Sequence, residues 1–194
     1  MKVDASFIQS AVTADDLPQD ALAEIALVGR SNVGKSSLIN ALVRQRLART
    51  SAAPGKTRLA NVYRVSRGGG RPFYLVDLPG YGYAAGQREE LEAVAREYFE
   101  SRSAARKDVG ALLLVDARHP GLPADRQAWA WLNRAADRVA IVATKIDKLS
   151  RSERQRAMRT NDAVFDAPVV PVSAATGEGL DELWKLIDQM TTPV

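Results

Sequence analysis

The sequence predicts a three-layer α/β domain in which helices flank a mostly parallel central sheet. From residue 24 to the end, short apolar runs alternate with segments of helical periodicity, as in α/β proteins. Several of the runs are apolar throughout, which is typical of strands covered on both faces. A chain of 194 residues leaves little room for a second core, so we expect residues 24–194 to form one domain.

The apolar runs and periodic segments give an order of elements. We expect strands at 24–28, 61–65, 73–76, 111–115, 139–143 and 169–172, and helices at 35–43, 89–101, 124–136, 150–159 and 180–190. The glycine run within 66–71 predicts a hairpin loop between the second and third strands. For residues 1–23 two interpretations remain: an added edge strand or a partly loose segment.

Composition excludes several classes of protein. The chain has no cysteine and a single histidine, His119, so disulfides, thiol catalysis and multi-histidine metal sites are excluded. No apolar run is long enough to span a bilayer and the start lacks the apolar core of a secretory signal, so we expect a cytoplasmic protein without membrane insertion. The net charge of +4 suits a polyanionic partner without requiring one.

A phosphate-binding loop is the clearest motif. Glycine, four residues and Gly-Lys-Ser follow the first apolar strand and precede a helix, so backbone amides and the helix N-terminus can surround phosphate oxygens. The lysine can reach the terminal phosphates and the serine hydroxyl can bind Mg²⁺. A glycine turn that binds nothing is the alternative, and the loop alone does not separate an ATPase from a GTPase. The predicted nucleotide contacts here are Gly29, Arg30, Ser31, Asn32, Val33, Gly34, Lys35, Ser36 and Ser37.

A carboxylate ends the third predicted strand, in the segment Asp77, Leu78, Pro79 and Gly80. Because carboxyl ends of parallel strands meet at one edge, we expect Asp77 to support Mg²⁺ from the second coordination shell. The Gly80 amide can meet the terminal phosphate. A plain turn is the alternative for this segment.

A threonine between these motifs predicts a nucleotide-dependent switch. Thr57 could place its hydroxyl on Mg²⁺ and its amide on the γ-phosphate, and loss of that phosphate would release the loop. An ordinary loop threonine is the alternative. The predicted contacts in this segment are Gly55, Lys56, Thr57, Arg58 and Leu59.

Two later strand ends predict recognition of guanine. The carboxylate of Asp147 can accept hydrogen bonds from the ring N–H and amine of guanine, whereas adenine offers no such donor pair. The stem of Lys145 can lie along the base, and a backbone amide at 173–174 can meet the guanine carbonyl. The predicted base contacts are Thr144, Lys145, Ile146, Asp147, Val172, Ser173 and Ala174.

With these motifs in order, the chain resembles the EngB (YihA/YsxC) family of bacterial ribosome-biogenesis GTPases. This family belongs to the Era-like (TrmE-Era-EngA-EngB-septin) group, whose fold is a Ras-like G domain of the P-loop NTPase class. The resemblance covers nearly the whole chain and includes the tyrosine-rich extension Tyr81-Gly82-Tyr83-Ala84 and the segment Asp116-Ala117-Arg118-His119. It implies a role in assembly of the large ribosomal subunit and an association with cell division and septation.

Two positions depart from the wider GTPase pattern. Thr144 stands where most members carry asparagine, so we expect a shorter tether to the base and an affinity of roughly micromolar order. Tyr81 stands where Ras-like proteins carry the glutamine that orients water, and nothing places Gln87 at the phosphate. We therefore assign no catalytic residue and expect slow turnover, on the order of 10⁻⁴ s⁻¹.

Asn32 suggests that the site could use a potassium ion. In some relatives an asparagine here helps to hold K⁺ against the phosphates, where it neutralises developing charge. The alternative is that Asn32 only shapes the loop.

Basic residues predict contact with ribosomal RNA. They are Arg44, Arg46, Arg49, Lys56 and Arg58 near the switch, Arg64, Arg67 and Arg71 at the glycine hairpin, and Arg151, Arg154, Arg156 and Arg159 on one helix. A solvated surface is the alternative. We expect a monomer that times assembly by hydrolysis, with two alternatives: a nucleotide-gated RNA- or protein-binding module, or an ATPase of the same topology.

Overall fold

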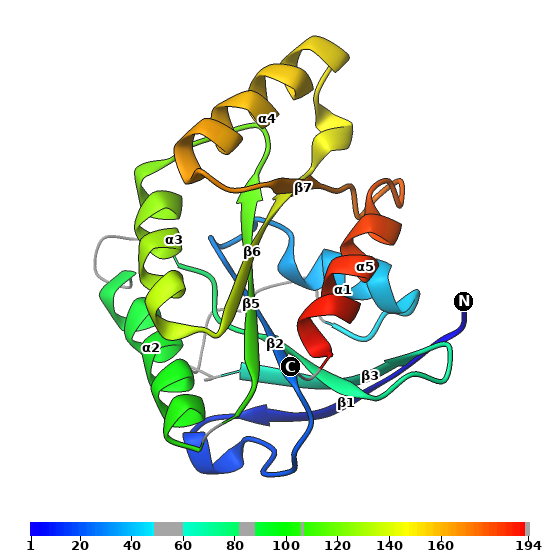
Figure 1. Ribbon diagram of the computed structural model, residues 1–194, viewed down its shortest axis with the longest axis vertical. Coiled ribbons are helices and arrows are strands. Elements are labelled where there is room, and N and C mark those ends of the chain that lie inside the picture. Colours follow the sequence, from blue (N-terminus) through cyan, green and yellow to red (C-terminus); the bar gives the residue numbers. More distant parts are fainter. Residues whose placement is uncertain (49–59, 82–87, 106, 193–194) are drawn as a thin grey trace.

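A seven-stranded sheet forms the centre of the protein in the part of the chain that the structure describes (Figure 1). The structure is a computed structural model that describes residues 1–48, 60–81, 88–105 and 107–192. The strand order is β1-β3-β4-β2-β5-β6-β7. The strands are β1 (Val3–Ala11), β2 (Glu24–Gly29), β3 (Ala60–Arg67), β4 (Phe73–Asp77), β5 (Val109–Asp116), β6 (Arg138–Thr144) and β7 (Val169–Pro171).

The sheet is parallel from β4 through β2, β5 and β6 to β7. The hairpin of β3 and β4 is antiparallel, and its turn contains Gly68 and Gly69 at positive φ, as the glycine run predicts. β1 adds an antiparallel edge strand beside β3, with a register shift between Phe7 and Gln9. The predicted mostly parallel sheet is thus confirmed.

Helices cover both faces of the sheet (Figure 1). α1 (Lys35–Val43) and α5 (Leu180–Thr191) pack on one face, whereas α2 (Arg88–Ala104), α3 (Pro123–Ala135) and α4 (Arg151–Phe165) contribute to the core on the other. The alternating residues of β2 and β5 enter both apolar clusters, which explains why these strands read as unbroken apolar runs. The predicted three-layer fold is confirmed.

The ends of some elements differ from the sequence-based expectation. α4 continues to Phe165 instead of ending at residue 159, because Ala157, Asn161 and Phe165 extend one buried face at a spacing of four. Its start is fixed by Ser150 and Glu153, which form a capping box. α2 begins at Arg88 and β7 ends at Pro171, each one position from the expected end. No helix among the described residues is both long and apolar enough to cross a membrane.

The carboxyl ends of four parallel strands lie at one edge of the sheet. β2 ends at Gly29, β4 at Asp77, β5 at Asp116 and β6 at Thr144, and the register pairs Asp116 with Thr144. This edge is where an open α/β sheet offers a crevice for a ligand.

Candidate nucleotide site

The loop between β2 and α1 has the backbone geometry of a phosphate cradle. Gly34, directly before α1, has φ 112° and Asn32 has φ 62°. A Cβ on Gly29 would stand 2.8 Å from the carbonyl oxygen of Leu114, so only glycine fits at this strand end. Because α1 begins at Lys35, the positive end of its dipole lies at the loop.

Lys35 lies inside this loop. Its ammonium group donates to the carbonyl oxygens of Gly29 at 3.2 Å and Arg30 at 3.5 Å. Burial lowers the pKa of Lys35, and the nearby charge of Asp77 opposes that effect. The Lys35 ammonium group thus donates its hydrogen bonds to two neutral carbonyl groups of the loop.

Ser36 and Asp77 form a polar pair beside the lysine. The Ser36 hydroxyl donates to Asp77 Oδ2 at 3.1 Å, and no described residue donates to the buried Oδ1. Burial raises the pKa of Asp77, while the Lys35 charge and the Ser36 hydrogen bond lower it. A hydroxyl and an unsatisfied carboxylate oxygen are ligand types that suit Mg²⁺ and its water shell, so the residues fit the ion that the fold implies.

Gly80 rests against the phosphate loop. The Ser31 hydroxyl donates to the Gly80 carbonyl oxygen at 2.9 Å, and the Ser31 amide donates to the carbonyl oxygen of Tyr81 at 2.9 Å. A Cβ on Gly80 would stand 2.7 Å from the Ser31 nitrogen and 2.8 Å from Lys35 Nζ. Only glycine can occupy this position without displacing the loop.

A cavity of about 710 Å³ lies between α1 and the loops after β6 and β7. Asp147 lines it and accepts a hydrogen bond from the Ser173 hydroxyl at 2.7 Å, which is the main cause that lowers the pKa of Asp147. Asp147 thus presents a negative charge at the cavity. The other lining residues are Val33, Gly34, Ser37, Leu38, Asn40, Ala41, Arg44, Gln45, Arg46, Thr144, Lys145, Lys148, Val172, Ala174 and Ala175.

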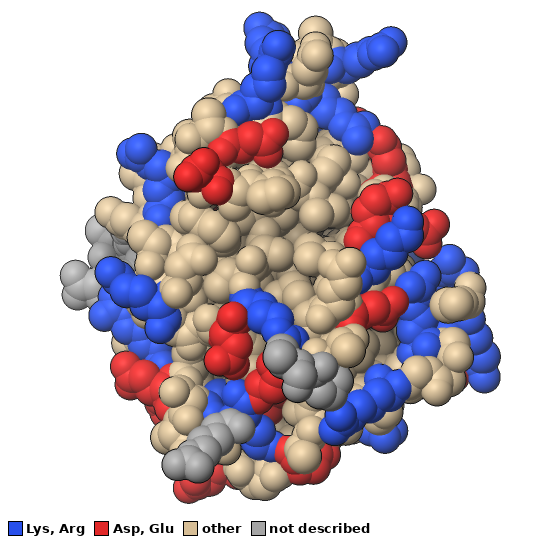
Figure 2. Space-filling model, in the orientation of Figure 1, with Lys and Arg blue, Asp and Glu red and all other residues tan. Residues whose placement is uncertain are grey.

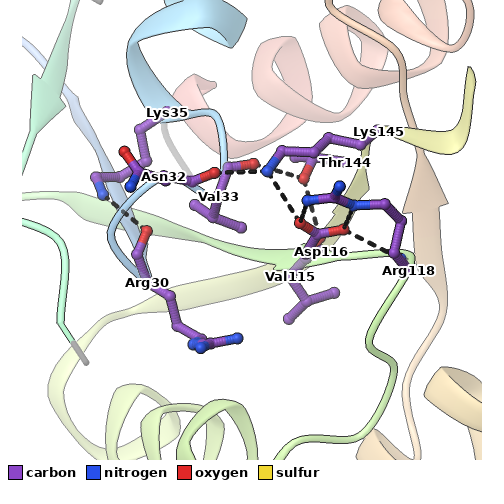
Figure 3. A network of polar contacts seen from close by, with 9 residues as sticks. All are labelled: Arg30, Asn32, Val33, Lys35, Val115, Asp116, Arg118, Thr144 and Lys145. Atoms are coloured by element: carbon purple, nitrogen blue, oxygen red, sulfur yellow. Dashed lines mark hydrogen bonds and ion pairs between the residues drawn. The ribbon is translucent and has the colours of Figure 1, made fainter. Parts of the chain in front are cut away.

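A network of charges fixes Lys145 next to this cavity (Figure 3). Its ammonium group donates to the Asn32 carbonyl oxygen at 2.6 Å and to Asp116 Oδ2 at 2.9 Å. Arg118 holds the same carboxylate in a two-point contact, with distances of 3.0 and 2.7 Å. Burial alone would raise the pKa of Asp116, but hydrogen bonds from Arg118 and Lys145 outweigh it and hold this pKa far below its usual range.

The side chain of Tyr81 points into the protein interior. Its hydroxyl donates to Asp125 Oδ1 at 2.9 Å, and both residues are buried. Asp125 lies in the first turn of α3, and burial raises its pKa to about 6. The phenol therefore lies against α3.

Comparison with known proteins identifies the family. The model of the 50S ribosome-binding GTPase family matches residues 24–145. A probable GTP-binding protein EngB of Pelotomaculum thermopropionicum is 43% identical over 196 residues, which cover 96% of each chain. The chain belongs to the EngB family.

Solved structures agree with the EngB fold. A crystal structure of a probable GTP-binding protein EngB superposes with a TM-score of 0.64 at 24% identity, covering 87% of this chain and 98% of that one. A variant of Aquifex aeolicus Era bound to GDP and AlF₄⁻ gives 0.72 at 24% identity, covering 89% of this chain. The chain spans 58% of that Era chain, so this likeness concerns the G-domain fold alone.

The structure of this EngB-family chain brings most of the predicted site residues to one edge. Residues 29–37 form the loop and the start of α1, residues 77–80 lie beside it, and residues 144–147 and 172–174 surround the cavity or support it. Gly55, Lys56, Thr57, Arg58 and Leu59 lie outside the described residues, as do Arg49 and Gln87.

Three contacts were not predicted from the sequence. They are three hydrogen bonds: from the Lys145 ammonium group to Asp116, from the Thr144 hydroxyl to Val33 in the phosphate loop, and from the Tyr81 hydroxyl to Asp125. Asp116 follows an apolar strand as Asp77 does, so the same rule could have found it. Nothing local in the sequence marks the other two, because their partners lie in distant segments.

Proposed function

We propose that this chain binds GTP and GDP with Mg²⁺, hydrolyses GTP slowly and acts as a switch in assembly of the large ribosomal subunit. One observation carries the proposal: the Ser36–Asp77 pair, the phosphate loop and the cavity beside Asp147 follow one another along a single edge of the sheet. A guanosine nucleotide with Mg²⁺ on its terminal phosphates presents its metal, its phosphates and its base in that same order.

Each group along this edge has a task. The loop amides and the Lys35 ammonium group bind the β- and γ-phosphates, and Lys35 exchanges two carbonyl acceptors for charged oxygens. Ser36 and Asp77 would hold Mg²⁺, directly or through its water shell, and the ion neutralises phosphate charge when bound. Thr57 as a second Mg²⁺ ligand remains a prediction.

The base is recognised by charge and shape. Asp147, kept ionised by the Ser173 hydroxyl, accepts the two donors of guanine, while the Lys145 stem lies along its face. An adenine base would leave this carboxylate without donors, which disfavours the alternative of an ATPase. The Ser173 amide already donates to the Glu178 carbonyl oxygen at 2.9 Å, so the Ala174 amide is the one that would meet the guanine carbonyl.

Hydrolysis by the isolated chain is slow. Because the Tyr81 hydroxyl is directed at Asp125, it does not orient the attacking water, and no other described residue is assigned that task. Potassium at Asn32 remains a prediction, and equal GTPase rates in potassium and sodium buffers would exclude it.

Contact with ribosomal RNA is the proposed output of the switch. Figure 2 shows basic side chains projecting over α4 at the top of the molecule, where Arg151, Arg156 and Arg159 are exposed. Arg44 and Arg46 are exposed at the rim of the base cavity. These cations suit RNA phosphates, and the binding should weaken steeply with salt. The role in cell division and septation is proposed from the family alone.

Two experiments test this function. Equilibrium binding should show GDP and a non-hydrolysable GTP analogue bound in preference to ADP, with binding lost in Lys35→Ala and kept in the exposed control Lys185→Ala.

Co-sedimentation with large-subunit particles should depend on nucleotide and salt. A variant that binds GTP without hydrolysing it should trap particles if hydrolysis is the timer. Normal release of the particles would support a nucleotide-gated binding module instead.

A further inference from the structure

The structure fixes three of the four backbone groups around Gly80 and Tyr81. The Gly80 carbonyl accepts from the Ser31 hydroxyl, the Tyr81 carbonyl accepts from the Ser31 amide, and the Tyr81 amide donates to the Gly29 carbonyl at 3.3 Å. The fourth group is the Gly80 N–H. Within the described part of the chain, no acceptor takes it. A donor held rigidly beside Lys35 is thus left available.

The anchor of this segment lies on another element. The hydroxyl of Tyr81 reaches Asp125 Oδ1 at 2.9 Å, and Asp125 is completely buried in the first turn of α3. Its other oxygen, Oδ2, is buried with no donor from any described residue. A buried carboxylate costs free energy unless it serves a partner, so this position requires an explanation beyond the helix N-terminus.

We infer that Asp125 is a positioning residue which, through the hydroxyl of Tyr81, holds the Gly80 N–H where the terminal phosphate of GTP binds. The inference rests on the proposed nucleotide site and adds the element that sets preference for the triphosphate. A donor that is already ordered loses little entropy when the phosphate arrives. GDP lacks the terminal phosphate and gains nothing from this donor.

The chain supplies a matched control for the anchoring bond. Tyr74 also donates its hydroxyl to an aspartate, Asp20, at 2.7 Å, but this pair lies at the opposite end of the sheet from Gly29 and Asp77. Tyr81→Phe and Tyr74→Phe each remove one phenolic hydrogen bond and keep the ring. Asp125→Ala removes the acceptor of Tyr81, whereas Asp125→Asn keeps an acceptor oxygen.

The experiment measures Kd for GDP and for a non-hydrolysable GTP analogue with Mg²⁺ in each variant. Tyr81→Phe and Asp125→Ala should weaken analogue binding by about threefold to tenfold, the worth of one hydrogen bond, with GDP within about twofold. Tyr74→Phe and Asp125→Asn should keep the wild-type ratio of the two Kd values. The double variant Tyr81→Phe/Asp125→Ala should lose no more than the stronger single variant.

Several results would overturn the inference. They are an unchanged or improved analogue affinity in Tyr81→Phe, an equal change in Tyr74→Phe, additive losses in the double variant, or no rescue by Asp125→Asn. If Asp125→Ala does not fold, the Kd values of Tyr81→Phe compared with those of Tyr74→Phe still test the inference. Failure of the proposed function would be different, because wild-type protein would then show no preference for GDP over ADP.

Discussion

The hydroxyl of Thr144 donates to the carbonyl oxygen of Val33 at 2.7 Å, so the segment proposed to bind the base is tied to the proposed phosphate loop across 111 positions of the chain. The same hydroxyl lies 3.1 Å from the carbonyl oxygen of Val115 on β5. Thr144, Val33 and Val115 are all buried, so neither carbonyl can replace this donor with bulk water. The hydroxyl therefore joins the two halves of the proposed nucleotide site.

Thr144→Val should remove the hydrogen bond that joins these halves while keeping the shape of the side chain. The change leaves the Val33 carbonyl without its buried donor, so we expect a loss of about 1–3 kcal/mol in unfolding free energy. GDP affinity should fall by at least threefold, because the loop and the base segment no longer hold a fixed spacing. Urea unfolding and nucleotide titration measure the two effects.

Thr191→Val is the control for that substitution, since its hydroxyl donates to the Ile187 carbonyl oxygen at 3.0 Å near the end of α5. It should leave GDP affinity unchanged. Equal GDP affinities in the Thr144 variant and the wild type would contradict the linking role.

A buried ion pair lies at the end of the sheet opposite the proposed nucleotide site. Glu24, at the start of β2, accepts from the Tyr98 hydroxyl at 2.6 Å and lies 3.4 Å from Arg102 Nε. Arg102→Met should destabilise the fold by about 3–5 kcal/mol because the Glu24 carboxylate loses its buried countercharge. Glu24→Gln/Arg102→Met should recover part of that loss.

Nucleotide affinity in folded Arg102→Met should equal that of the wild type, because the pair lies at the far end of β2 from Gly29. Denaturant unfolding and GDP titration test both statements. A double variant less stable than Arg102→Met would argue against the ion pair.

Sequence patterns predicted the layers and the succession of strands and helices along the chain, because apolar runs and helical periods are local properties. They also predicted the nucleotide edge, since residues such as Asp77 and Asp147 follow apolar strands and parallel strands end together. The partners of Tyr81 and Thr144 were beyond such reasoning. They depend on how α3 packs and on the register of β5 with β6, which tertiary packing decides.

Asp147→Asn should greatly reduce guanine recognition. An amide offers one acceptor and one donor in place of two acceptors, so the donor would face a donor of the base. GDP affinity should fall by about a hundredfold or more, a size typical of a lost buried polar match. Asp162→Asn, on the exposed face of α4, serves as the control. Comparable GDP binding by the two variants would place the base elsewhere.

The buried carboxylate of Asp125 makes stability depend on pH. Its pKa rises from 3.8 to about 6, mainly because of burial and also because of the Asp116 charge, while the Tyr81 hydroxyl and the Arg30 charge oppose the rise. The folded state thus binds this proton more tightly than the unfolded state. Protonated Asp125 therefore stabilises the folded state: this contribution is fully present below about pH 4 and is lost as the pH rises through about 6.

Comparison of the wild type with Asp125→Asn isolates this effect from the other titrating groups. The unfolding free energy of the wild type should fall relative to the variant by on the order of 2–3 kcal/mol between about pH 4 and pH 7. Urea unfolding of both proteins across that range measures it. Two parallel pH profiles would show that Asp125 titrates in the folded state as it does in the unfolded chain, and they would contradict the raised pKa.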